Sequence, residues 1–155
     1  MIIRKAIEKD AKEIVSLLKE VLEIHANIRP DLFKSGTCKY KEEDILNKLK
    51  NKNTPTYVAE EDGKFLGYLL CEIVEIKEPN RNAMKVMYID DIAVKKEFRG
   101  KHIGEALFNF IKEEAKRLNC YEITLRIYEG NESAMSFYKK MGMKTQSSYL
   151  EYILK

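Results

Sequence analysis

The sequence predicts one α/β domain in which a mixed sheet carries helices on both faces. Strand-like and helix-like runs alternate along the chain, an Asp-Gly pair separates two β-rich runs, and a later β-rich run opens directly into an amphipathic helix. The Asp-Gly pair favours antiparallel strands, whereas the alternation with helices favours a mixed sheet. We expect six to seven strands and about four helices.

The expected elements follow from apolar periodicity and from turn residues. In chain order, we expect a strand at 2–6, a helix capped by Asp10, an irregular stretch at 25–40, a short charged helix at 41–50, and strands at 56–60 and 65–76 joined through Asp62-Gly63. The second half is expected to hold a third meander strand ending at Val94, a helix at about 102–118, a strand at 122–127, a short helix at 132–141 and a closing hairpin that reaches Lys155.

Composition limits the classes of protein that fit. The 155 residues suit a single domain, 1–155, and no apolar run is long enough to span a membrane. The first residues lack the apolar core of a signal peptide, so we expect a cytoplasmic protein with no membrane partner. Three widely spaced cysteines and two histidines favour neither a disulfide framework nor a metal site. The formal net charge is +3, and the basic residues are interspersed with acidic ones along the chain. We therefore also expect no nucleic-acid partner.

The junction between residues 94 and 104 carries the strongest functional signal. Helical periodicity begins at Ile103, directly after a β-rich run and a short polar turn. A helix start leaves N–H groups unpaired and carries a partial positive charge, so it favours a bound anion. We therefore expect a diphosphate site at Arg99, Gly100, Lys101, His102, Ile103 and Gly104. A Rossmann fold is the nearest alternative, but the turn follows an antiparallel meander and Gly-x-Gly-x-x-Gly is missing.

A second motif lies downstream, at Asn131, Ala134, Phe137, Tyr138 and Gly142. With both motifs in this order and spacing, the chain resembles the GNAT superfamily of acetyl-CoA-dependent N-acetyltransferases over nearly its full length. The resemblance implies a centrally splayed sheet and acetyl-CoA as the acetyl donor. His102 stands where the family pattern has its central glycine. We expect the histidine to be tolerated, because this position contributes mainly a backbone N–H.

The resemblance also implies roles for residues on the strand before the turn. A carboxylate would take the proton of the attacking amine, and we favour Asp90 over Asp91, which we expect to be structural. In a regular strand the two side chains point to opposite faces, so only one can face the acceptor. The backbone of Ile92, Ala93 and Val94 would bind the pantetheine amide and polarise the thioester carbonyl.

Further roles fall on the second motif and on the strand geometry. Tyr138 would protonate the departing thiolate, and Asn131 and Ser133 would contact the cofactor arm, with an N-cap as the structural alternative for Asn131. A β-bulge near Ala93 would separate this strand from Leu125 and admit the cofactor arm.

The function expected from these residues is acetyl transfer to a primary amine of a small molecule or peptide, whose identity stays open. A coenzyme A-binding sensor without turnover is the alternative from another class. A nucleic-acid-binding domain rests on net charge alone. Near the C-terminus, apolar residues between Thr145 and Leu154 favour strand-edge pairing, which makes a homodimer possible.

Overall fold

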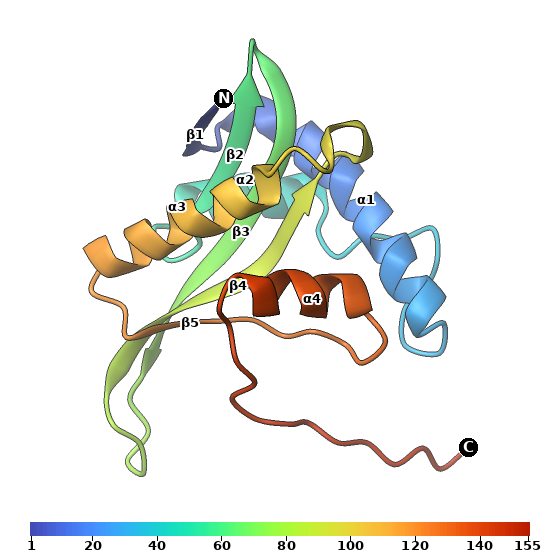
Figure 1. Ribbon diagram of the computed structural model, residues 1–155, viewed down its shortest axis with the longest axis vertical. Coiled ribbons are helices and arrows are strands. Elements are labelled where there is room, and N and C mark those ends of the chain that lie inside the picture. The colour runs from blue at the N-terminus through green and yellow to red at the C-terminus, as the bar shows by residue number, and fades with distance from the viewer.

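The computed structural model describes residues 1–155 as a five-stranded sheet with helices on both faces (Figure 1). The strands lie in chain order, the first four antiparallel and the last parallel to its neighbour. They are β1 (Ile2–Lys5), β2 (Thr56–Glu61), β3 (Lys64–Ile76), β4 (Met84–Val94) and β5 (Glu122–Thr124). The helices are α1 (Ala11–Ile28), α2 (Glu42–Lys50), α3 (Ile103–Arg117) and α4 (Glu132–Lys140), with 3₁₀ turns at Glu8–Asp10 and Lys96–Phe98. The mixed α/β class and the four helices are confirmed.

Two features of the sheet differ from the expectation: its last strand is shorter than predicted, and it has five strands instead of six to seven because the closing hairpin is missing. β5 has three residues instead of the six predicted, because its pairing with β4 ends at Tyr88 and Thr124. β4 continues to Val94 without that partner, so the sheet opens there. The closing hairpin is also absent, and residues 143–155 contain neither helix nor strand. That segment has no glycine, proline or asparagine to form a tight turn.

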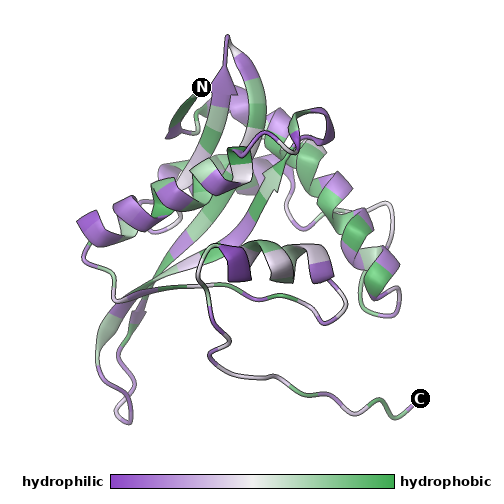
Figure 2. Cartoon of the chain, in the orientation of Figure 1, coloured by the Kyte–Doolittle hydropathy of each residue, from purple (hydrophilic) through white to green (hydrophobic).

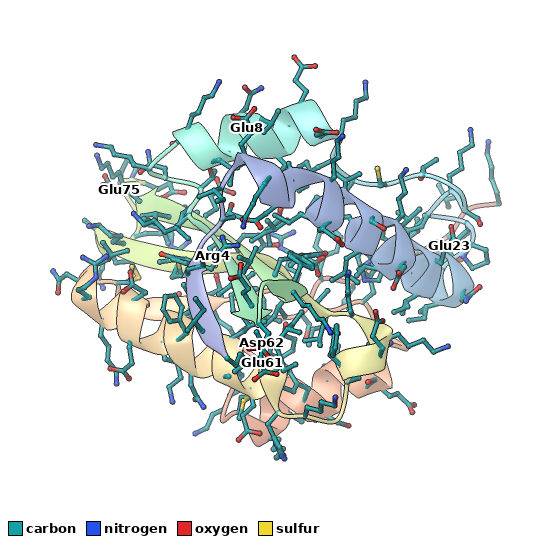
Figure 3. All side chains as sticks on the ribbon, turned by 90° about the horizontal axis from the view of Figure 1, so that it is seen from above. Arg4, Glu8, Glu23, Glu61, Asp62 and Glu75 are labelled. Carbon is teal, nitrogen blue, oxygen red and sulfur yellow. The ribbon has the colours of Figure 1, made fainter.

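Two apolar cores lie on opposite faces of the sheet, as the view from above shows (Figure 3). One core joins α1 and α2 to Val58, Tyr68, Leu70 and Ala93. The other joins α3 and Tyr138 of α4 to alternate residues of the same strands. Both long helices are amphipathic, with hydrophilic and hydrophobic residues alternating along the ribbon (Figure 2). Period-two alternation in the strands thus supplies both faces of one sheet.

Asp10 lies where it was predicted to, immediately before α1, but it does not cap that helix. Its buried carboxylate accepts a hydrogen bond from the N–H of Ile7 at 2.8 Å and pairs with Arg4 at 2.8 Å. Arg4, labelled on β1 in Figure 3, also donates to Glu60 on β2. The carboxylate therefore links β1 to the turn before α1, because a buried charge is stabilised by a partner of opposite sign.

No helix in the structure combines the length and the apolar character needed to cross a membrane.

Candidate active site

The turn between β4 and α3 presents a run of unpaired backbone donors. The N–H groups of residues 100–105 donate to no acceptor within the chain, and the first N–H of α3 to do so is that of Ala106, which bonds the carbonyl of His102. Gly100 and His102 both have left-handed backbones, with φ of 78° and 61°. Alternating left-handed and right-handed residues turn successive N–H groups toward one concavity, which is an anion-binding geometry.

His102 shows that the glycine position of the turn pattern needs a positive φ in this chain. We expected the histidine to be tolerated because only its N–H matters, and the chain does adopt the left-handed geometry with it. For an L-residue that conformation costs roughly 1 to 2 kcal/mol. The imidazole is exposed, and its Nδ1 lies 3.1 Å from the carboxylate of Glu105. The side chain therefore leaves the concavity to the backbone.

The two sequence motifs meet where α3 packs on α4. A Cβ placed on Gly104 would lie 3.5 Å from the Phe137 ring, in ordinary van der Waals contact. Lys140 also lies 3.8 Å from Glu105. At the start of α4, the Asn131 side chain accepts a hydrogen bond from the N–H of Ala134 at 3.2 Å. The structural alternative for Asn131, an N-cap, is therefore present. Ser133 lies exposed in the first turn of this helix.

The β-bulge of β4 lies at Asp90, three residues before the predicted position near Ala93. Leu70 faces Asp91 while Cys71 faces Ile89, so Asp90 is the extra residue. A bulge interrupts the alternation of side chains. Ile89 and Ile92 pack in the core with α3, whereas the contacts of Asp90 and Asp91 lie on the α1 side. The prediction that the two aspartates point to opposite faces is wrong, because it assumed a regular strand.

Asp90 is held by two residues from the loop between α1 and α2. Lys39 Nζ lies 2.5 Å from one carboxylate oxygen, and the Tyr40 hydroxyl donates to the other at 2.5 Å. The carboxylate is 9% exposed, whereas the Lys39 side chain is 57% exposed. Burial and the adjacent Asp90 charge raise the pKa of Tyr40 to about 12, so its hydroxyl remains a donor. An alkylammonium therefore already occupies the carboxylate that we predicted to receive the acceptor amine.

Asp91 accepts a hydrogen bond from the hydroxyl of Tyr68, which lies in the core beneath α1. Burial raises the pKa of Asp91 to about 6, and the adjacent Asp90 charge contributes to this rise, against the Tyr68 hydrogen bond that lowers it. The predicted structural hydrogen bond of Asp91 is therefore present. Its raised pKa also gives it a titration close to neutral pH.

Tyr138 is buried on α4 against two aromatic rings. Its ring centroid lies 5.0 Å from that of Phe137 and 6.1 Å from that of Phe108. Burial raises the pKa of Tyr138 well above its ordinary value, and the charge of Asp91 adds to the shift. The hydroxyl makes no hydrogen bond within the chain, and it is partly accessible to solvent, because no fully buried polar side-chain atom lacks a partner. At neutral pH it is a protonated donor that is free to bond a ligand.

The backbone of β4 past the bulge faces an open edge. Lys95 N–H donates to Leu66 O on β3, so alternation turns the N–H groups of Val94 and Ile92 the other way. On that side β5 no longer pairs with β4. Ala93 faces β3 and approaches it closely, because a Cβ on Gly67 would lie 2.4 Å from the Ala93 carbonyl oxygen. The open edge of β4 leads directly into the turn at 99–104.

Sequence reasoning missed Lys39, Tyr40 and Tyr68 as neighbours of the two aspartates. Lys39 and Tyr40 come from the segment predicted to be irregular, about fifty positions before Asp90, and no local pattern connects them to it. Tyr68 did carry a signal, since a tyrosine inside an apolar strand run needs a polar partner for its hydroxyl. No group of three or more His, Cys, Asp or Glu side chains is arranged to hold a metal ion.

Comparison with known proteins gives one family. Residues 18–143 match the model of the Acetyltransferase (GNAT) family. N-alpha-acetyltransferase 30 of Schizosaccharomyces pombe is 29% identical over 99 residues, which cover 64% of this chain and 63% of that protein. Thialysine N-epsilon-acetyltransferase of Sus scrofa is 24% identical over 149 residues, which cover 93% and 84%. Among curated relatives, six of the matched stretches span only 33 to 63% of the relative's length.

The crystal structure of a point mutant of the BH1408 protein from Bacillus halodurans superposes on this chain with a TM-score of 0.95, at 28% identity and with 100% of both chains covered. The chain belongs to the GNAT family of acetyltransferases.

Proposed function

We propose that this protein transfers an acetyl group from acetyl-CoA to a primary alkylamine, by direct attack when both substrates are bound. One observation carries the proposal: the unpaired edge of β4 runs without interruption from the anion-binding turn at 100–105 to the carboxylates of Asp90 and Asp91. A donor with a diphosphate at one end and a reactive group at the other fits such a path.

The donor would be held mainly by backbone groups. The N–H groups of residues 100–104, that of His102 included, would bind the diphosphate, with Arg99 and Lys101 adding positive charge. Ile92 and Val94, on either side of Ala93, would bond the pantetheine arm and the carbonyl that develops negative charge. One oxyanion donor is typically worth about 3 to 4 kcal/mol. Asn131 and Ser133, at the start of α4, would contact the same arm.

The acceptor amine would arrive at Asp90. The position of Lys39 Nζ against this carboxylate supports an alkylammonium as the preferred group. A primary amine is mostly protonated at neutral pH, and delivering it neutral costs roughly 4 to 5 kcal/mol. We assign Asp90 as the base that takes this proton. Asp91, on the same face, would act as its positioning residue.

Tyr138 would act as the acid. The neutral amine forms its bond to the carbonyl carbon, the carbon–sulfur bond breaks, and the leaving sulfur takes the phenolic proton; the proton that the new amide nitrogen gives up passes to solvent, from which the phenolate is reprotonated. The raised pKa of Tyr138 supports this direction, because the phenol is protonated when the sulfur departs. The absence of an internal hydrogen bond leaves its proton available.

The test is release of free coenzyme A from acetyl-CoA, followed with a thiol reagent across polyamines, aminoglycosides, amino acids and short peptides. Acceptor-dependent release with a primary amine supports the transferase. If acetyl-CoA binds by calorimetry but no acceptor gives release, the protein is a coenzyme A-binding sensor. No binding at all would contradict the assignment of the turn. The names of two relatives, an N-alpha-acetyltransferase and a thialysine N-epsilon-acetyltransferase, support α-amino groups of peptides and lysine analogues as the first acceptors.

A further inference from the structure

The last residues of the chain form an extended arm, residues 143–155, that leaves α4 and runs away from the two layers (Figure 1). Its apolar side chains are almost completely exposed, at 97% for Tyr149, 88% for Leu150, 87% for Tyr152 and 88% for Leu154. Figure 2 shows hydrophobic residues continuing to the end of this arm. An exposed cluster of large apolar side chains of this kind marks an interaction site.

Polar contacts fix the direction of the arm. The Gln146 amide donates to the Glu122 carboxylate at 3.0 and 3.1 Å, which holds the start of the arm beside β5. Further along, Glu151 accepts from Arg29 at 2.6 and 3.2 Å, next to the end of α1. The apolar residues on either side of Glu151 are thus held in position, although they touch little of their own chain.

The sequence of the arm suits a strand buried on both faces. No glycine or proline follows Gly142, and between 149 and 154 every position except Glu151 is apolar or aromatic, namely Tyr149, Leu150, Tyr152, Ile153 and Leu154. Aromatic and β-branched residues favour strands, and a strand covered on both faces is apolar nearly throughout. What the arm lacks is a neighbouring strand.

A receiving surface exists on the same molecule. β5 is the edge of the sheet and pairs only with β4, so its outer edge is free. Beside it lies a groove of about 550 Å³ between α3, β5 and the root of the arm. Its apolar lining includes Phe108, Ala115, Ile123 and Met143.

The arm of the same chain is directed elsewhere. Met143 lines the groove itself, and Gln146 is bonded at the start of β5. From there the Arg29 contact draws residues 149–154 to the end of α1, beyond the groove. The arm of the same chain therefore leaves the groove and the edge of β5 uncovered.

We propose that the protein is a two-fold dimer in which the arm of each copy, residues 148–154, pairs as an added strand with the outer edge of β5 in the other copy and places its apolar side chains over the groove. Because the two copies are identical, a two-fold axis repeats the contact, and each arm covers the groove of the other copy. Two tyrosines can bury about 300 to 500 Å² per arm, and three aliphatic residues add to this, so two arms reach the range of roughly 1,200 Å² or more that stable interfaces bury. The proposal is independent of the transferase activity.

The mass of the full chain in solution tests the proposal, by sedimentation equilibrium over a wide range of concentrations. We expect the mass of two chains, and a loss of at least about 100-fold in dimer affinity for Leu150→Asp combined with Tyr152→Asp. The matched control is Thr145→Asp combined with Ser147→Asp, which adds the same charge to the same arm outside the proposed strand. A full chain that stays monomeric, or a double Leu150/Tyr152 variant that stays dimeric, overturns the proposal.

A thiol already present in the groove tests where the arm docks. Cys120 lines the groove, and Tyr152→Cys adds a thiol to the arm. Mild oxidation should give a covalent dimer that is linked through Cys120 and is lost when Cys120→Ser is added. A disulfide within one chain would place the arm in its own groove and overturn the proposal. A covalent dimer that persists with Cys120→Ser would place the arm elsewhere, with the same consequence.

Discussion

Asp90 and Asp91 are consecutive in β4, yet both side chains lie on the α1 face of the sheet, because Asp90 is the extra residue of a β-bulge. Their surroundings differ. Asp90 is paired with Lys39 and Tyr40 at a partly open position, whereas Asp91 is bonded to the buried hydroxyl of Tyr68. Two adjacent carboxylates in different environments can serve different roles.

The first prediction separates these roles through Asp90→Asn and Asp91→Asn. If Asp90 is the base, Asp90→Asn should lower kcat by about 100-fold or more, and Asp91→Asn should lower it much less. Rates are measured with the best primary amine from the acceptor panel. For the parent protein we expect a step in kcat near pH 6, from the pKa of Asp91, that is no larger than the loss in Asp91→Asn; the step should disappear in Asp91→Asn and persist in a distant control, Asp62→Asn. Equal losses in both variants would contradict the assignment.

The second prediction concerns stability and Asp91. The pKa of Asp91 is raised from 3.8 to about 6 by folding, so between these values the folded protein holds a proton that the unfolded chain has lost. Its contribution to stability is full below about pH 4 and is lost as the pH rises through about 6. Relative to Asp91→Asn, the parent protein should lose up to roughly 3 kcal/mol of unfolding free energy between pH 4 and pH 7.

Urea denaturation of the two proteins at each pH measures this difference. Parallel stability curves for the two proteins would show that Asp91 does not titrate in this range.

The third prediction concerns Tyr138. Tyr138→Phe keeps the ring packed on Phe108 and Phe137 and removes a hydroxyl that has no partner in the chain. We expect kcat to fall about 100-fold or more, while the Kd for acetyl-CoA and the melting temperature change little. Tyr121→Phe, at an exposed tyrosine, is the matched control. A Tyr138→Phe variant with parental kcat would remove this residue from the proton transfer.

The fourth prediction concerns the left-handed residues of the turn. His102→Gly should stabilise the protein by about 1 kcal/mol, because glycine adopts a φ of 61° without the penalty of a side chain. Gly100→Ala should destabilise it by a similar amount, although a Cβ there would meet no atom within 4 Å. Chemical denaturation measures both, and calorimetry with acetyl-CoA should show binding retained in His102→Gly. Destabilisation by His102→Gly would mean that the imidazole contributes more than its contact with Glu105.

The fifth prediction concerns Lys39. An incoming ammonium must displace Lys39 Nζ from Asp90, so Lys39→Ala should lower the KM for a cationic amine several-fold, with the KM for acetyl-CoA unchanged. Lys34→Ala removes an equal charge from an exposed position of the same loop and serves as control. A raised KM in Lys39→Ala would instead make Lys39 part of the acceptor site.

The sequence by itself determined the features that depend on neighbours along the chain. The order of helices and strands, the strand-to-helix turn with its free N–H groups and the cap at Asn131 follow from periodicity, glycine position and capping residues. These features depend on residues close together in the sequence. They are enough to identify the family and the part of the candidate site that lies at the turn and at the start of α4.

Only the tertiary structure decided the rest. The bulge at Asp90 arises from pairing with β3 and leaves no mark in the alternation of β4. Lys39, Tyr40 and Tyr68 reach the two aspartates across 51, 50 and 23 positions of the chain. The residues of the arm favour strands, so the sequence predicts a hairpin there. The structure has no strand in the arm, because a strand forms only where a partner edge is available. Bulges, long-range contacts and strand partners depend on what lies alongside in space, which a single sequence does not specify.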